Sequence, residues 1–207
     1  MSSSNLIRWS GLAALVGGVL LAVFDVAEAV IIGGRPESVV AGTGALIIVR
    51  IAFLVPIVLT SLGLVGLHAR QAEQAGTLGL VAFLAAFTGT AMVFGLQWSA
   101  AFIGSWLAGA APELLDTEPA GLLAAGFMLS FVLFALGWLL FGLAALQARV
   151  LPRGAAVLLM AGAVLFLALL MLDIPGSSVV FGVALLWMGY ALWSGAGEPA
   201  LTTKAVA

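Results

Sequence analysis

Three ionisable residues lie inside long apolar stretches of the chain, where charged side chains are rare. Asp25 and Glu28 belong to the first stretch, and Arg50 lies in the second. Burying an unpaired charge in a bilayer is costly, so such residues are usually paired or functional. Asp25 and Glu28 are three residues apart and share a helix face, and Arg50 comes about one and a half turns into a helix that returns from the same side. This spacing predicts that the three side chains meet at a similar depth.

Two kinds of chemistry fit such a cluster. It could form a gated cation or proton site, or the polar end of a ligand pocket. It could also be a buried ion pair that orients the first two helices, because paired charges in membranes often need no further role. The two interpretations differ in what Arg50→Ala should do: lost stability indicates the structural pair, and lost activity at unchanged stability indicates the functional site.

Two further residues belong to the candidate site. Gln97 lies near the outer end of the third apolar stretch, where it could line the same cavity or hydrogen-bond a neighbouring helix. Pro56 follows Arg50 by six residues and cannot donate a hydrogen bond to the carbonyl of Ala52. We therefore expect a helix kink at Pro56, with a freed carbonyl that could face Arg50, a water or a ligand.

The remaining residue types argue against catalysis. The chain has no cysteine and one histidine, His68, so it offers neither a thiolate metal site nor paired histidines for a haem. No G-x-x-x-x-G-K-[ST] phosphate loop and no G-x-S-x-G serine pattern occur. We predict a protein that is not an enzyme and that holds no metal or cofactor. Seven Lys and Arg against nine Asp and Glu leave a net charge of -2, too little basic charge for a nucleic-acid partner.

The elements that must position these residues are membrane-spanning helices. The chain has 207 residues, of which 64% are hydrophobic and 8% charged, against roughly a quarter charged in a soluble domain. Its mean hydropathy is +1.27. About 20 apolar residues cross the ~30 Å hydrocarbon layer as a helix, which predicts an all-α bundle in one transmembrane domain over residues 1–194, with a short cytoplasmic tail over 195–207. The six predicted spans cover approximately residues 9–32, 45–67, 78–100, 120–146, 154–173 and 177–194.

The arginines predict the orientation of this bundle, because cytoplasmic loops carry an excess of Lys and Arg. Only Arg35 falls on the other side from the larger group, which consists of Arg8, Arg70, Arg149, Arg153 and Lys204. We therefore expect both termini in the cytoplasm and a multi-pass protein in the inner or plasma membrane of a bacterium. Residues 101–119 begin apolar and turn acidic, which fits either a short interfacial helix on the outer face or a long, tilted third helix.

Two stretches suggest an internal repeat. Residues 63–70 match residues 142–149 at five of eight positions, and both stretches end in arginine. Helical hairpins repeated in parallel orientation would produce this pattern. A chain so rich in Leu, Ala and Gly would also produce it by composition.

The back half of the chain resembles a known family. Phe134 to Leu139, the turn from Val150 to Arg153, and Leu158 to Gly162 carry the likeness, which is concentrated in residues 133–173. They are similar to a six-span bacterial integral membrane protein family catalogued only as a domain of unknown function. The resemblance implies a six-helix architecture and no known reaction.

Two functions remain open. The six-helix plan also resembles the substrate-binding subunits of energy-coupling-factor vitamin transporters, whose small-residue docking motif is loosely echoed by Ala13 and Gly17. This favours a small transport or ligand-binding module, with a site near Asp25, Arg50 and Gln97 for a small molecule or a cation. The alternative is a non-catalytic accessory or scaffold subunit, which packs against a membrane-protein partner or a second copy through its small residues. A pocket at those three residues would favour the first, and a closed bundle with one flat Gly/Ala face the second.

Overall fold

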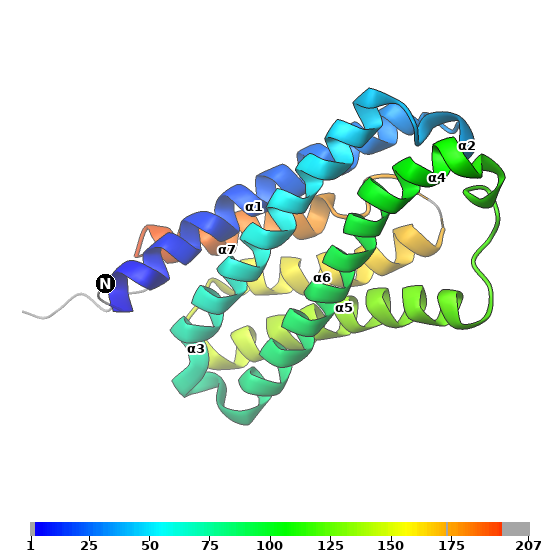
Figure 1. Cartoon of the computed structure of the whole chain (residues 1–207). Coiled ribbons are helices and arrows are strands. Elements are labelled where there is room, and N and C mark those ends of the chain that lie inside the picture. The colour runs from blue at the N-terminus through cyan, green and yellow to red at the C-terminus, as the bar shows by residue number, and fades with distance from the viewer. Residues whose placement is uncertain (1–2, 173, 196–207) are drawn as a thin grey trace, which may run out of the picture.

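The computed structural model describes residues 3–172 and 174–195, with side chains from Asn5 onward. The predicted tail beyond residue 195, Lys204 and the last residue of the fifth predicted span, Asp173, lie outside the described residues. All regular elements in the described part are helical (Figure 1). They are α1 (Ser3–Ile32), α2 (Glu37–Val40), α3 (Gly44–Ser99), the π-helical turn η1 (Ala100–Gly104), α4 (Ser105–Ala110), the 3-10 turn η2 (Pro112–Leu114), α5 (Gly121–Ala148), α6 (Arg153–Met171) and α7 (Val179–Trp193).

Helix α3 is a hairpin with almost no loop. Gly76 has φ 56° and ψ -145°, the only non-helical backbone angles inside α3, and this conformation requires a residue without a Cβ atom. The chain reverses there, so residues 44–75 and 77–99 run back along each other (Figure 1). The rings of His68 and Phe83 stack across the hairpin with centroids 4.4 Å apart. Sequence reasoning left residues 68–77 outside the spans, but they stay helical on both sides of Gly76.

Four described helical segments are long and apolar enough to cross a membrane. They are Asn5–Ile32, Gly44–Ala110, Gly121–Ala148 and Arg153–Met171. The second of them contains both halves of α3. Helix α7 is apolar but has 15 residues, which corresponds to about 22 Å of helix. The fold is therefore an all-helical bundle of the membrane type.

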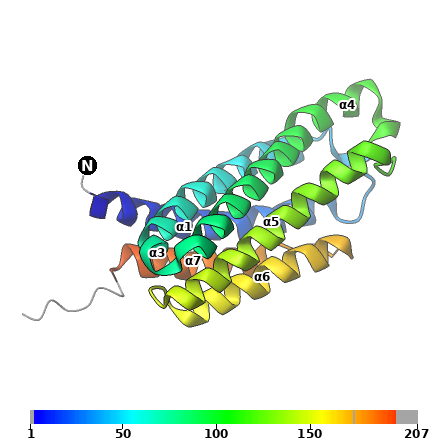
Figure 2. The same cartoon turned by 90° about the horizontal axis from the view of Figure 1, so that it is seen from below.

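The helices form a closed ring. Helix α1 contacts α3 and α7, α3 contacts α5, α5 contacts α6, and α6 contacts α7. Figure 2 shows them side by side along one general direction. A ring of this kind surrounds a central volume that side chains must fill or leave open.

One sign of charge predominates at each end of the bundle, with Arg35 at one end and Glu73 at the other as exceptions. One end gathers the start of α1, the turn of α3, the α5–α6 connection and the end of α7 (Figure 1). We call it the arginine end; it carries Arg8, Arg70, Arg149 and Arg153. The opposite end, which we call the acidic end, carries Glu37, Glu113, Asp116 and Glu118.

Small residues bring the helices together. A Cβ atom added to Gly18 would collide with the backbone of α7 at Gly182, and one added to Gly189 would collide with α1 at Leu15. Gly63 faces Ala14 at the α1–α3 contact in the same way. Close backbone approach is how helices associate where lipid provides no hydrophobic drive. The glycines therefore position α1 between α3 and α7.

The acidic end is closed by the segment after α3. The helix continues through η1 and α4 to Ala110 and is followed by η2. Asp116 accepts hydrogen bonds from the backbone N–H of Ser38, at 3.0 Å, and from its hydroxyl. These bonds hold the pKa of the Asp116 carboxyl below its usual value. They tie α2 to the loop before α5.

Candidate functional site

The guanidinium of Arg50 joins three elements at the acidic end. Its Nε donates to Oε1 of Glu28 at 2.8 Å, and its Nη2 donates to Oε1 of Glu37 at 2.6 Å. Glu28 lies in the last turns of α1 and Glu37 begins α2. The Arg50 side chain is 8% exposed, and those of Glu28 and Glu37 are 17% and 34% exposed. One buried cation is thus compensated by two carboxylates.

Asp25 faces a different helix. Its Oδ2 accepts hydrogen bonds from the backbone N–H of Ser178, at 2.6 Å, and from the Ser178 hydroxyl, at 2.7 Å. Ser178 immediately precedes α7, so the carboxylate of α1 caps the N-terminus of α7, where a negative charge is favourable. The structure therefore brings Arg50 to Glu28 but not to Asp25. The reason is that α1 lies between α3 and α7, so residues three apart can face different neighbours.

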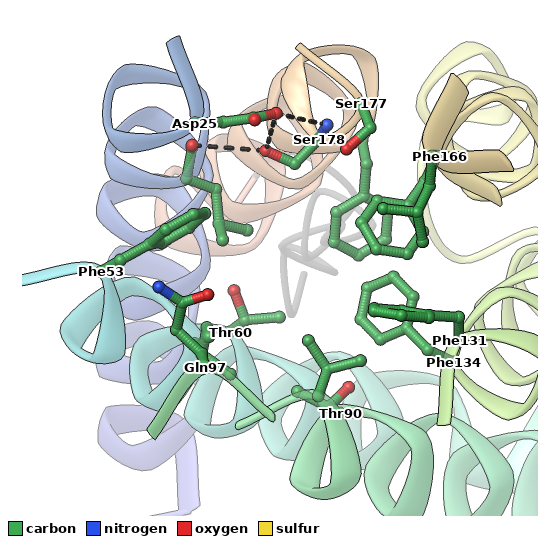
Figure 3. A pocket seen from close by; sticks show the side chains of 15 residues that line it. Asp25, Phe53, Thr60, Thr90, Gln97, Phe131, Phe134, Phe166, Ser177 and Ser178 are labelled. Atoms are coloured by element: carbon green, nitrogen blue, oxygen red, sulfur yellow. Dashed lines mark hydrogen bonds between the residues drawn. The ribbon is translucent and has the colours of Figure 1, made fainter. Parts of the chain in front are cut away.

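A cavity of about 200 Å³ lies inside the ring, in the half nearer the acidic end. Both halves of α3 and the helices α1, α5, α6 and α7 contribute to it (Figure 3). Of the residues that the sequence pointed to, Asp25 and Gln97 line it, while Glu28, Arg50 and Pro56 do not. The described lining residues are Leu21, Asp25, Phe53, Ile57, Thr60, Thr90, Val93, Gln97, Phe131, Phe134, Phe166, Leu170, Ser177, Ser178 and Phe181.

Two polar groups in the cavity wall lack hydrogen-bond partners among the described residues. They are Oγ1 of Thr60 and Nε2 of Gln97, both of them buried atoms. Thr90 differs, because its hydroxyl donates to the carbonyl of Ala86 and accepts from the Trp138 indole at 3.0 Å. A buried polar group without a partner costs about 1–3 kcal/mol. A bound molecule that hydrogen-bonds to Thr60 and Gln97 would therefore relieve this cost.

Pro56 does not interrupt α3. The backbone keeps helical angles on both sides of it, and the break in α3 lies at Gly76. Pro56 packs at the close approach to α1, where a Cβ atom added to Gly17 would lie 3.3 Å from its carbonyl oxygen. Its contribution is to helix packing beside the cavity.

Sequence reasoning missed several residues of this region. Glu37 lies between the first two predicted spans and was not among the candidate site residues, but it supplies the second carboxylate to Arg50. Ser178 stands in a Ser-Ser pair before an apolar run, a pattern typical of a helix N-cap. The rings of Phe131, Phe134 and Phe166 carry no signal of their own, because phenylalanine in an apolar helix faces lipid as readily as a cavity.

The described residues contain no group of three or more His, Cys, Asp or Glu side chains that could hold a metal ion. No protein-family model, curated protein or solved structure matches the chain. The resemblance to the six-span bacterial family therefore stays a prediction. The function has to be argued from the cavity itself.

Proposed function

We propose that the chain is a six-span membrane protein that binds a small molecule in the cavity in the outer half of its bundle. The observation that carries the proposal is the cavity inside the helix ring, with the unpartnered Thr60 hydroxyl and Gln97 amide in its wall. Few polar groups among apolar and aromatic side chains are typical of a small-molecule site. Binding of this kind would serve either a receptor or a transport cycle.

We also propose that the chain crosses the membrane six times, with the arginine end in the cytoplasm. Each half of α3 exceeds the ~20 residues that a crossing needs, which adds to α1, α5 and α6. Helix α7 is shorter, and a short helix is accommodated by local thinning of the bilayer. An even number of crossings puts both termini on one side. The arginine end is then cytoplasmic, so the cavity lies in the outer half of a cell membrane.

The size of the cavity limits the ligand. An apolar cavity of about 150 Å³ holds benzene, so about 200 Å³ accommodates a single ring with a short substituent. The five phenylalanines in the wall favour an apolar body. A polar substituent would find its partners at Thr60 and Gln97.

The accessory-subunit alternative has less support. It requires a small-residue face left open for a partner, but the glycines in closest contact lie between helices of the same chain, as Gly18 and Gly189 do in the α1–α7 contact. The Arg50 cluster is better explained as a structural clamp of α1, α2 and α3, since it lies outside the cavity wall.

Native mass spectrometry of protein released gently from its own membrane tests the proposal. We expect a retained small molecule at one per chain. Val93→Phe, which fills the cavity, should abolish retention. Val81→Phe is the matched control, because Val81 is 52% exposed on the outside of the same hairpin half, and it should keep the molecule. A bound protein partner with no small molecule, unaffected by Val93→Phe, would overturn the proposal in favour of the accessory role.

A further inference from the structure

The cavity has two chemically different walls. On one side the rings of Phe131, Phe134 and Phe166 face it from α5 and α6 (Figure 3). Their contacts extend to Phe181: the centroids of Phe134 and Phe166 are 4.8 Å apart, and those of Phe134 and Phe181 are 5.2 Å apart. The polar side chains of Asp25, Thr60 and Gln97 lie away from this group of rings, on the side where Phe53 also lies (Figure 3).

Asp25 is the only ionisable residue among the described lining residues. Within the described part of the chain it has no cationic partner, because Arg50 is committed to Glu28 and Glu37. Both hydrogen bonds from Ser178 end on Oδ2 of Asp25. The protein thus brings a carboxylate into the wall of a largely apolar cavity without a side-chain countercharge.

Both walls favour positive charge. An aromatic ring is negative over its face and attracts a cation by about 0.5–2 kcal/mol. A carboxylate adds a charge-assisted hydrogen bond to an ammonium group. An anionic ligand would meet repulsion from Asp25 and from the ring faces.

A metal cation does not fit this wall. Small hard cations such as Ca²⁺ and Mg²⁺ require about six oxygen ligands, and most of this surface is phenyl rings and aliphatic side chains. An organic cation matches it, because its apolar body fills the aromatic part while its charge meets the carboxylate. Thr60, whose residue is 1% exposed and whose hydroxyl has no partner in the described chain, offers a further hydrogen bond.

We infer that the cavity selects a small organic monocation, a protonated amine attached to one apolar ring, with its ammonium group at Asp25 and its ring against Phe134 and Phe166. This inference rests on the proposed function and specifies its ligand class. The cavity volume excludes amines with several fused rings.

Three probes with the same phenyl ring test the inference: 2-phenylethylamine, which is protonated at neutral pH, the neutral 2-phenylethanol, and the anionic 3-phenylpropionate. Their affinities for the purified full chain in detergent are measured by isothermal titration calorimetry. We expect the amine to bind about tenfold tighter than the alcohol, and the acid to bind most weakly. Asp25→Asn should remove the advantage of the amine and leave the affinity for the alcohol within about twofold.

Two controls accompany this comparison. Glu113→Gln removes a carboxylate at the same end of the bundle but outside the cavity wall, and should leave all three affinities unchanged. If Asp25→Asn fails to fold because α7 loses its cap, Asp25→Ser replaces it. That variant keeps an oxygen that can accept a hydrogen bond from Ser178 but removes the negative charge, and it should also remove the advantage of the amine over the alcohol.

The outcomes separate the two proposals. Equal or tighter binding of the alcohol or the acid by the wild-type chain, abolished by Val93→Phe, would overturn the selection for cations while supporting a binding cavity. Binding of no probe at millimolar concentration would also overturn it. If in addition no small molecule is retained by the native protein, the binding function itself is contradicted.

Discussion

Arg50 is the residue on which the acidic end depends. Its side chain is buried and donates hydrogen bonds to carboxylates from two other elements. Its removal would leave Glu28 and Glu37 as neighbouring negative charges without a cation, one of them largely buried. Breaking a buried ion pair by removing one partner is strongly destabilising. A clamp of this kind stabilises the fold without contacting a ligand.

We predict that Arg50→Ala lowers the free energy of unfolding by about 3 kcal/mol. The measurement is thermal or denaturant unfolding in detergent. Arg35→Ala is the matched control, because Arg35 donates only to the backbone carbonyls of Ile31 and Ile32 and is exposed. Unchanged stability of Arg50→Ala together with lost ligand binding would contradict the clamp and place Arg50 in the functional site.

Thr60 differs from Arg50, because its hydroxyl is expected to serve ligand binding at a cost to the stability of the empty protein. Its buried hydroxyl lacks a partner in the described chain, so Thr60→Val should raise the free energy of unfolding of the empty protein by about 1 kcal/mol. The same substitution should lower the affinity for the ligand. Ser61→Ala is the control, since the Ser61 hydroxyl is already bonded to the carbonyl of Ile57 and its loss should not affect binding. Unfolding curves with and without bound ligand check both statements. A destabilised Thr60→Val with unchanged binding would show that the hydroxyl serves the fold.

At the scale of elements, the glycine contacts determine which helices are neighbours. Gly18 and Gly189 allow α1 and α7 to touch backbone to backbone, and this contact brings Asp25 to the N-terminus of α7. The cap and one wall of the cavity therefore depend on residues that have no polar chemistry of their own.

We predict that Gly18→Ala destabilises the protein by about 1–3 kcal/mol, because the added methyl group would push α1 away from α7. Gly95→Ala is the control: a Cβ atom there meets no other atom within 4 Å, so stability should stay the same or rise slightly. The free energy of unfolding of both variants is the measurement. Equal effects of the two substitutions would mean that the α1–α7 contact is not close in solution.

Helical elements follow from this sequence more directly than the contacts between them. Apolar runs of sufficient length predict long helices, and the long α1, α3, α5 and α6 are present. The partner of Asp25 could not be predicted. Asp25 and Glu28 lie about 60° apart around the helix axis, and this angle is enough for Glu28 to face α3 while Asp25 faces α7. That choice depends on glycine packing across helices far apart in the sequence. The sequence pointed to a pocket near Asp25, Arg50 and Gln97, and Asp25 and Gln97 line the cavity. The size of the cavity and its aromatic wall could not be predicted, since the cavity is the volume that the ring leaves unfilled.

At the scale of the whole molecule, the distribution of charge predicts how the bundle lies in the membrane. The chain contains no cysteine, so single cysteines can report the side directly. Glu118→Cys at the acidic end should react with a membrane-impermeant maleimide in intact cells. Gln74→Cys, at the turn of α3, should react only after the cells are permeabilised, because the proposed orientation puts the arginine end in the cytoplasm. The reverse pattern would contradict the orientation, and labelling of both residues in intact cells would contradict the hairpin as a membrane crossing.

We propose that the helix ring encloses a binding site for a small molecule. An experimental density map of the protein purified with its retained molecule tests this proposal. We predict non-protein density the size of one substituted ring, bounded by Phe134 on one side and within hydrogen-bond distance of Thr60 or Gln97 on the other. A cavity closed by its own side chains, or filled by a lipid chain entering from the bilayer, would contradict the account.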